Sequence, residues 1–255
     1  MMSLFAVFLT FYYSVISFLE RKVFIKNIKK DDLVLDAGSG DKPLWRADVI
    51  VDKYLDDDQQ RFGGSVLLDR RKLFFKADIE RLPFRDKIFD FVFCAHVLEH
   101  TKHPDKAILE LQRVGKSGYI EVPRASFDFL QTFPSHLWYC EQEGKTLVFK
   151  KRIRDHNFYL NSIRRFGEKF FDNALLQMLL AKNFNFIFIR IFWKDKIDSR
   201  IETKDGSPYI YDDNSKTKEK KFSEFISFVC YKVFYLFATF LFYKKKSISR
   251  NELLK

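Results

Sequence analysis

Two glycines separated by one residue, Gly38 and Gly40, follow the short apolar run 33–35. Glycine adopts positive φ without steric cost and lets a ligand approach the backbone closely. In an α/β sheet, a turn of this kind at the carboxyl end of a strand is where a nucleotide-like ligand binds. The same pattern occurs in many ordinary turns, so its meaning depends on the residues that follow.

Acidic side chains end or follow the next two apolar runs. Asp52 closes the run 49–51 and is placed to accept hydrogen bonds from two ribose hydroxyls. Asp78 can accept a hydrogen bond from an adenine amino group, and Ile79 can pack on the purine face. A dinucleotide site places its acid about 20 residues after the glycines, beyond a full helix. Asp52 comes only 12 residues after Gly40, which disfavours a nicotinamide dinucleotide.

A third block, 94–100, follows the largely apolar run 89–93 and would place polar groups at the mouth of the fourth strand. His96 and His100 within it are candidate bases for deprotonating an acceptor. For His100 the alternative is a structural role near the start of the next helix, and His96 can equally shape the pocket.

Three further polar side chains are candidates outside that block. His136 lies in a region expected to cover the site, and His156 follows it along the chain. Glu121 ends the fifth apolar run near the same mouth, where a salt bridge to a local Lys or Arg is the alternative role.

Taken together, these residues closely resemble the class I S-adenosylmethionine-dependent methyltransferases of the broad small-molecule type. The resemblance covers about residues 30–123, extending at most to Trp193, and it implies S-adenosylmethionine as cofactor. It is carried by Asp36-Ala37-Gly38-Ser39-Gly40, Leu82-Pro83-Phe84, Phe89-Asp90-Phe91-Val92 and Leu98-Glu99-His100.

The resemblance also implies roles for individual residues, with no residue assigned to a metal. The sequence departs from the usual pattern of this family at two places. Lys42 stands where the first loop has its third glycine, and residues 114–118 stand where the family has a Leu-Lys-Pro-Gly-Gly block. The implied contacts are Asp36, Gly38 and Gly40 to the methionine moiety, Asp52 to the ribose, Asp78 and Ile79 to the adenine, and the backbone of Cys94 and Ala95 near the carboxypropyl and sulfonium groups.

The elements that must position these residues are apolar runs alternating with crossovers, which indicates a parallel sheet with helices on its faces. The predicted fold is α/β, a Rossmann-like doubly wound and mostly parallel sheet. A late antiparallel strand is expected over 184–193, and a hairpin with a glycine turn over 138–150. The other expected elements are strands Leu33–Asp36, Val49–Asp52, Leu73–Lys76, Phe89–Cys94 and Gly118–Val122, and a helix over Pro104–Arg113.

Both ends of the chain are apolar and are followed by basic residues. Residues 1–19 carry no charged side chain, and their length is at the lower limit of about 17–25 residues for a membrane span. A helix packed on the domain, an interfacial anchor and a short span all fit this run. The run 222–243 contains Glu224 and Lys232, and a charge within a span is costly. It is therefore expected to form an amphipathic helix on a membrane surface or to pack against the N-terminal helix.

Composition restricts the class of protein. The three cysteines, Cys94, Cys140 and Cys230, are widely spaced, which favours a reducing compartment without a disulfide framework or structural zinc. The net charge is +11, yet residues 31–123 carry 15 basic and 18 acidic side chains, so the excess positive charge lies outside the ligand-binding block. Basic residues are not interleaved with aromatics as in an RNA-binding module, and a nucleic acid partner is not expected.

The sequence therefore predicts methyl transfer from S-adenosylmethionine to an unidentified small-molecule or lipid- or glycan-linked acceptor. A catalytically silent Rossmann-like binding module and a nicotinamide-dependent oxidoreductase are the alternatives, and the oligomeric state is left open. We expect a cytoplasmic protein, and association of its apolar ends with the inner face of the membrane is left open. The expected organisation is an apolar helix over 1–30, a methyltransferase domain over 31–203 with a substrate-covering insertion over 124–183, a linker over 204–221, and an apolar helix with a basic tail over 222–255.

Overall fold

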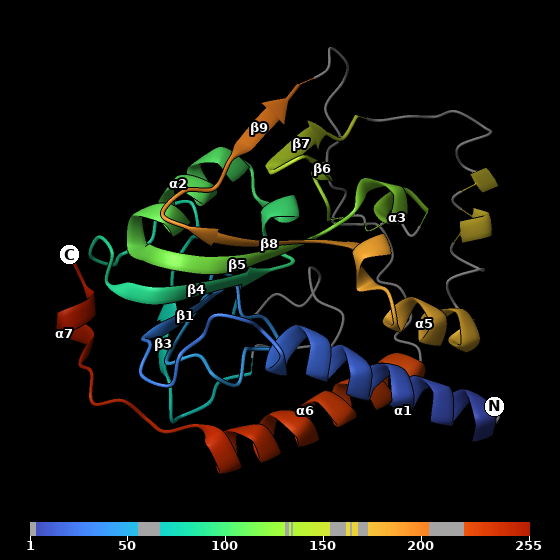
Figure 1. Cartoon of the computed structure of the whole chain (residues 1–255), viewed down its shortest axis with the longest axis horizontal. Helices are drawn as coiled ribbons and strands as arrows, with labels where there is room; N and C mark the ends of the chain where they lie inside the picture. The colour runs from blue at the N-terminus through green and yellow to red at the C-terminus, as the bar shows by residue number, and fades with distance from the viewer. Residues whose placement is uncertain are drawn as a thin grey trace.

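The computed structural model describes residues 4–55, 67–130, 133, 135–153, 162–163, 165–167, 173–203 and 222–255. A six-stranded sheet lies at its centre, with strand order β3-β2-β1-β4-β5-β8 (Figure 1). The strands are β1 (Val34–Ala37), β2 (Val49–Asp52), β3 (Leu73–Lys76), β4 (Phe89–Ala95), β5 (Gly115–Pro123) and β8 (Phe188–Lys194).

The first five strands are parallel, and β1 pairs with β2 on one side and β4 on the other. The chain therefore winds in one direction from β1 to β3 and in the other from β4 onward. In open α/β sheets a ligand binds beyond the carboxyl ends of the strands at this reversal. The predicted mostly parallel, doubly wound sheet is confirmed.

Strand β8 runs antiparallel to β5 and completes the sheet, as predicted. The expected strand over 184–193 is wrong at its start, because Phe184–Phe186 form a short 3₁₀ turn. Phe184 stacks on Phe188, the first residue of β8, with ring centroids 5.9 Å apart, and both side chains belong to an apolar cluster separate from the two cores of the sheet. Periodicity cannot separate a short buried turn from a strand within such a run.

Both faces of the parallel sheet are buried, as is usual for strands made of continuous apolar runs. The larger core lies between the sheet and helix α2 (Pro104–Val114), which begins with a proline in its first turn. The smaller core is on the opposite face, and its buried members are Val34, Leu44, Ala47, Phe91, Phe93 and Tyr119.

The connection from β1 to β2 contains only turns, in keeping with its short length. The terminal helices α1 (Leu4–Phe18) and α6 (Phe222–Phe242) pack on one another beneath the sheet, on the side away from α2 (Figure 1). Tyr231 of α6 donates to the carbonyl of Pro43 in this connection, and Trp45 Nε1 donates to Lys22 O at 2.8 Å. The two ends of the chain thus cover a region where a crossover helix would otherwise lie.

The hairpin predicted over 138–150 is also present. It consists of β6 (Trp138–Glu143) and β7 (Thr146–Lys151), with Gly144 at φ +61° in the turn. A third strand, β9 (Ser199–Glu202), pairs in parallel with β7. Further helices in the part of the chain that the structure describes include α3 (Ala125–Leu130), α5 (Ala174–Ala181) and α7 (Arg250–Leu253). The expected linker over 204–221 and the candidate His156 lie outside the described residues.

Candidate functional site

The glycine turn after β1 is built as the sequence requires. Gly38 and Gly40 have φ of +80° and +57°, and the backbone N–H groups of Gly38 and Ser39 both donate to Val51 O, at 2.8 and 3.0 Å. A Cβ on Gly38 would lie 2.3 Å from Cγ2 of Val97. Glycine is therefore required at this position both by conformation and by space.

Asp52 at the end of β2 holds the same turn. One carboxylate oxygen accepts from Gly40 N and the other from Tyr54 N, both at 2.9 Å. Asp52 is thus positioned at the β1–β2 edge where the ribose contact was predicted.

Asp36 is buried below the turn. Its Oδ2 accepts a hydrogen bond from Leu44 N at 2.6 Å, so the carboxylate holds the backbone of the connection that follows the turn. Burial raises the pKa of Asp36 to about 6, although Lys22 and the Leu44 hydrogen bond oppose the shift. Lys22 Nζ donates to Lys42 O at 2.8 Å and lies 4.4 Å from the Phe93 ring centroid. Burial lowers the pKa of Lys22 to about 8, partly offset by Asp36.

Asp78 and Ile79 follow β3 along the same edge of the sheet. One oxygen of Asp78 is 2.7 Å from Lys53 Nζ, and the other accepts from Glu80 N at 3.0 Å. Burial would raise the pKa of Asp78, but the hydrogen bonds from Lys53 and Glu80 hold it below its usual value. Ile79 is buried in the larger core, so it presents little side-chain surface to a ligand.

The end of β4 supplies Cys94 and Ala95. The Cys94 side chain is buried in the larger core, and burial raises the pKa of its thiol well above the usual value. A contact from this residue to a ligand would therefore be made by its backbone, which is the kind of contact that the resemblance implies.

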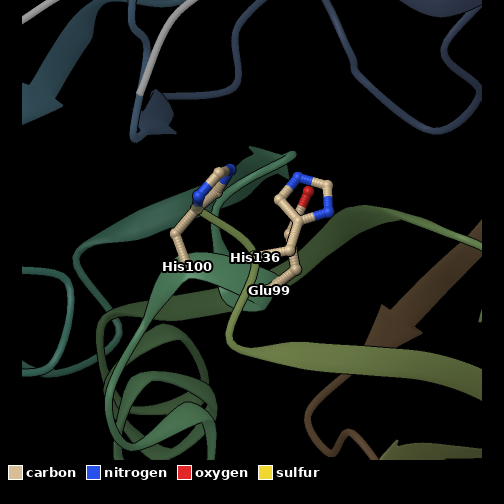
Figure 2. Close-up of side chains that lie close together, drawn as sticks. All are labelled: Glu99, His100 and His136. Carbon is tan, nitrogen blue, oxygen red and sulfur yellow. The ribbon is translucent and has the colours of Figure 1, made fainter. Parts of the chain in front are cut away.

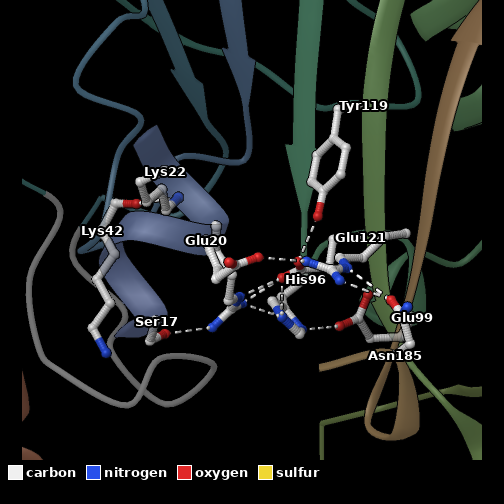
Figure 3. Close-up of polar contacts among 11 residues, drawn as sticks. Ser17, Glu20, Lys22, Lys42, His96, Glu99, Tyr119, Glu121 and Asn185 are labelled. Carbon is white, nitrogen blue, oxygen red and sulfur yellow. Dashed lines mark hydrogen bonds and ion pairs between the residues drawn. The ribbon is translucent and has the colours of Figure 1, made fainter. Parts of the chain in front are cut away.

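His96, directly after β4, lies in a partly buried polar network with Glu121 and Arg21. Oε1 of Glu121 accepts from Arg21 Nε at 2.7 Å and is 3.0 Å from His96 Nε2, while Tyr119 Oη donates to Oε2 at 2.6 Å. Figure 3 shows His96, Tyr119 and Glu121 converging from neighbouring strands. Burial alone would raise the pKa of Glu121, but Arg21 and His96 hold it far below its usual value.

The backbone of His96 is strained, with φ at +58°, a value that few residues other than glycine adopt. Its N–H donates to Glu121 O at 2.8 Å, which holds this conformation. Strain of this kind collects at functional sites. Burial lowers the pKa of His96, but the neighbouring carboxylates of Glu121 and Glu99 outweigh this effect and raise the value.

His100 lies in a second group, beside His136, with ring centroids 4.6 Å apart. Burial and the neighbouring His136 lower the pKa of His100 to about 4, so its imidazole is neutral at pH 7. The two candidate bases therefore have different partners. His96 contacts the Glu121 carboxylate, whereas His100 contacts the loop that carries Ser135 and His136.

Sequence reasoning missed the contribution of the N-terminal segment. Arg21 and Lys22 lie in a π-helical turn, Leu19–Val23, that extends α1 toward the sheet. Such turns occur often at functional sites. The two basic residues were noted only as the end of an apolar run, and the predicted local partner of Glu121 is in fact Arg21, 100 residues away.

Comparison with known sequences bears on the same region. Residues 51–120 match the family described as "Methyltransferase domain". The chain is 32% identical over 108 residues to the ubiquinone/menaquinone biosynthesis C-methyltransferase UbiE of Burkholderia mallei, covering 36% of this chain and 42% of that protein. Residues 51–120, which run from β2 into β5, are therefore similar to a methyltransferase domain.

The chain is also 36% identical over 89 residues to an uncharacterised protein of Methanocaldococcus jannaschii, covering 35% of this chain and 38% of the relative. The chain thus spans about two fifths of the length of these curated relatives. Among solved structures, a Pyrococcus horikoshii OT3 protein aligns with a TM-score of 0.37 at 18% identity, over 61% of this chain and 81% of that one.

Proposed function

We propose that the chain transfers a methyl group from S-adenosylmethionine to a small-molecule or lipid-linked acceptor. The main observation behind the proposal is a group of ligand-binding features near the point where the strand order reverses, between β1 and β4. A positive-φ glycine turn, Asp52 and Asp78 lie there on the carboxyl-end edge of three adjacent parallel strands. Methyltransferase domains in general use S-adenosylmethionine. The chemical class of the acceptor is proposed from other features of the structure.

The glycine turn fits the methionine end of that cofactor. Within the described residues, Ser39 Oγ and Asp41 Oδ2 are buried and make no hydrogen bond. A buried polar atom without a partner is costly, so these atoms favour a polar ligand in the turn. In this proposal the turn from Asp36 to Gly40 binds the methionine moiety, Asp52 the ribose and Asp78 the adenine.

The cofactor supplies a methyl group already activated on a sulfonium, so the protein mainly has to align donor and acceptor. His96 and the backbone of Ala95 then lie where β4 ends beside the glycine turn. The ion pair between Arg21 and Glu121 fixes the His96 ring in that position. His96 is the residue that we assign to face the acceptor.

An apolar surface formed by α1 and α6 supports a lipid-linked acceptor and a place at the membrane surface. Within the described residues, one helix segment, Phe225–Phe242, is long and apolar enough to cross a membrane, and 22% of it is buried. Lys244 and Lys245 follow it and are exposed. An apolar helix face with basic flanking residues binds anionic lipid surfaces. The exposed large apolar residues of the two helices are Leu4, Phe5, Phe8, Phe11, Phe225, Val229, Val233, Leu236, Phe237, Phe240, Leu241 and Phe242.

The test is transfer of a radiolabelled methyl group from S-adenosylmethionine into separated acceptor pools by the purified full-length chain. We expect label in a lipid extract, dependent on enzyme and lost in Asp52→Asn, whereas Asp105→Asn, an exposed carboxylate on α2, behaves as wild type. Label in RNA or water-soluble metabolites alone would contradict the lipid-linked acceptor. Label in no pool, from protein that binds the cofactor, would favour a catalytically silent module.

A further inference from the structure

Three side chains next to the proposed cofactor site bring metal-binding atoms together. Glu99, His100 and His136 each offer one donor atom, and these atoms all lie within 4.8 Å of one another. Figure 2 shows the two imidazole rings with the Glu99 carboxylate beside them. The residues come from two segments that a hydrogen bond from Leu137 N to Glu99 O, 2.8 Å long, holds side by side.

Glu99 is the unusual member of the group. It is completely buried, and within the described residues neither of its carboxylate oxygens accepts a hydrogen bond. Nδ1 of His96 lies 3.3 Å from Oε1 of Glu99, as an ion-pair contact without hydrogen-bond geometry. A buried carboxylate needs a cation and hydrogen bonds to offset its lost hydration. The residues around Glu99 supply this only in part.

The two histidines are oriented in the way that metal-binding histidines are. Nδ1 of His136 is 2.7 Å from Oδ1 of Asp128, a buried carboxylate on α3. Nδ1 of His100 is 3.1 Å from the carbonyl oxygen of Ser135. When Nδ1–H donates to a carboxylate or a carbonyl, the tautomer is fixed and Nε2 keeps its lone pair for a metal.

We propose that Glu99, His100 and His136 bind one divalent transition-metal ion, with Asp128 and the carbonyl of Ser135 orienting the two imidazoles. Two imidazole nitrogens and one carboxylate are a donor set that zinc and its first-row neighbours accept. Donors around a tetrahedral zinc are about 3.3 Å apart, so the three side chains would draw together by roughly an ångström on binding. The proposal does not depend on methyl transfer or on the cofactor.

The test is titration of the chelator-treated full-length protein with Zn²⁺ alone, followed by calorimetry. We expect one equivalent to bind to wild type and equally to His103→Gln, which removes an exposed histidine outside the group. Glu99→Gln and His136→Gln are expected to weaken binding at least 100-fold. Asp128→Asn keeps all three ligands, and we expect it to weaken binding about 10- to 100-fold.

X-ray absorption at the zinc edge of the wild-type protein gives a readout that does not require any variant to fold. The expected first shell contains two imidazole nitrogens and at least one carboxylate oxygen. A shell of oxygen atoms alone, or wild-type affinity in the folded Glu99→Gln variant, would overturn the proposal. Failure of folded wild type to bind zinc would also overturn it and leave the contact between His96 and Glu99 as the reason for the buried carboxylate.

Discussion

Arg21 and Glu121 are separated by 100 residues in the chain, and Arg21 Nε donates to Glu121 Oε1 at 2.7 Å. The Glu121 side chain is 1% exposed and that of Arg21 19%. The pair joins the N-terminal helix to the end of β5, and Tyr119 and His96 complete the environment of the carboxylate. Arg21, which lies outside the parallel sheet, therefore supplies the positive charge beside Glu121 at the mouth of the site.

Removing one partner of this pair should destabilise the fold. Arg21→Leu leaves a buried carboxylate without its main cation, and we expect the free energy of unfolding in urea to fall by about 3 kcal/mol. The double variant Arg21→Leu with Glu121→Leu should recover part of that loss. As a control, Glu20→Gln removes an exposed partner of Arg190, 3.7 Å away, and should change stability by less than about 0.5 kcal/mol. Additive effects of the two Leu substitutions would contradict a coupled pair.

Gly38→Ala should be far more costly than Gly144→Ala, although both positions have positive φ. At Gly144 a Cβ meets nothing within 4 Å, so only the conformational cost of about 1 kcal/mol applies. At Gly38 the new Cβ collides with Val97 as well. Urea denaturation should therefore show a loss of more than about 2 kcal/mol at Gly38, reduced when Val97→Ala is added. Equal losses at the two glycines would argue against the close packing of the turn.

Lys72 should make stability rise with pH above neutrality. Burial lowers its pKa to about 7, although Asp69, Asp48 and Asp36 oppose the shift. In the unfolded chain its pKa is about 10.4. Between these values the unfolded state binds a proton that the folded state lacks, so stability increases as pH rises and falls as pH drops through 7. The difference in free energy of unfolding between wild type and Lys72→Met should grow by up to about 1.4 kcal/mol per pH unit in this window.

The same point can be measured directly by NMR titration of the lysine ε-methylene groups, with Lys72→Arg identifying the resonance. A midpoint near 7 is expected. A midpoint near 10 would mean that the carbonyls of Trp45 and Ala47 and the Tyr243 ring, 3.9 Å away, fully stabilise the ammonium.

Charges placed on the α1–α6 surface should abolish membrane binding. Phe8 and Phe240 are 60% and 81% exposed, so Phe8→Glu and Phe240→Glu leave the core unchanged. We expect wild type to float with vesicles that contain anionic lipid, and each variant to bind at least 10-fold less. Leu109→Glu, on α2 at the opposite face of the sheet, is 63% exposed and should bind as wild type. Equal flotation of all four proteins would remove the support for a membrane surface.

The parallel strands could be predicted closely because each is a short apolar run bounded by turn residues. The bounds of β2 and β3 are as predicted, whereas β5 begins three residues earlier than expected, at Gly115. Gly118 lies within β5, where a Cβ would meet Val92 O at 2.2 Å, so glycine here serves sheet packing rather than a turn.

The long-range contacts could not be predicted in the same way. The burial of Arg21 against Glu121 depends on where α1 packs, and no local spacing records it. His100 and His136 are likewise 36 residues apart, and only the loop before β6 brings them together. The residues of the glycine turn were found because their chemistry is local, while the residues that surround the turn are assembled by the fold.

Cofactor binding tests the central claim most directly. Calorimetric titration of the folded full-length protein with S-adenosylhomocysteine should give a Kd in the micromolar range, on the order of −8 kcal/mol. Asp52→Asn should weaken it at least 10-fold, and the exposed control Asp105→Asn should leave it unchanged. Absence of binding by folded wild type, or equal binding by Asp52→Asn, would contradict a cofactor site at the carboxyl ends of β1 and β2.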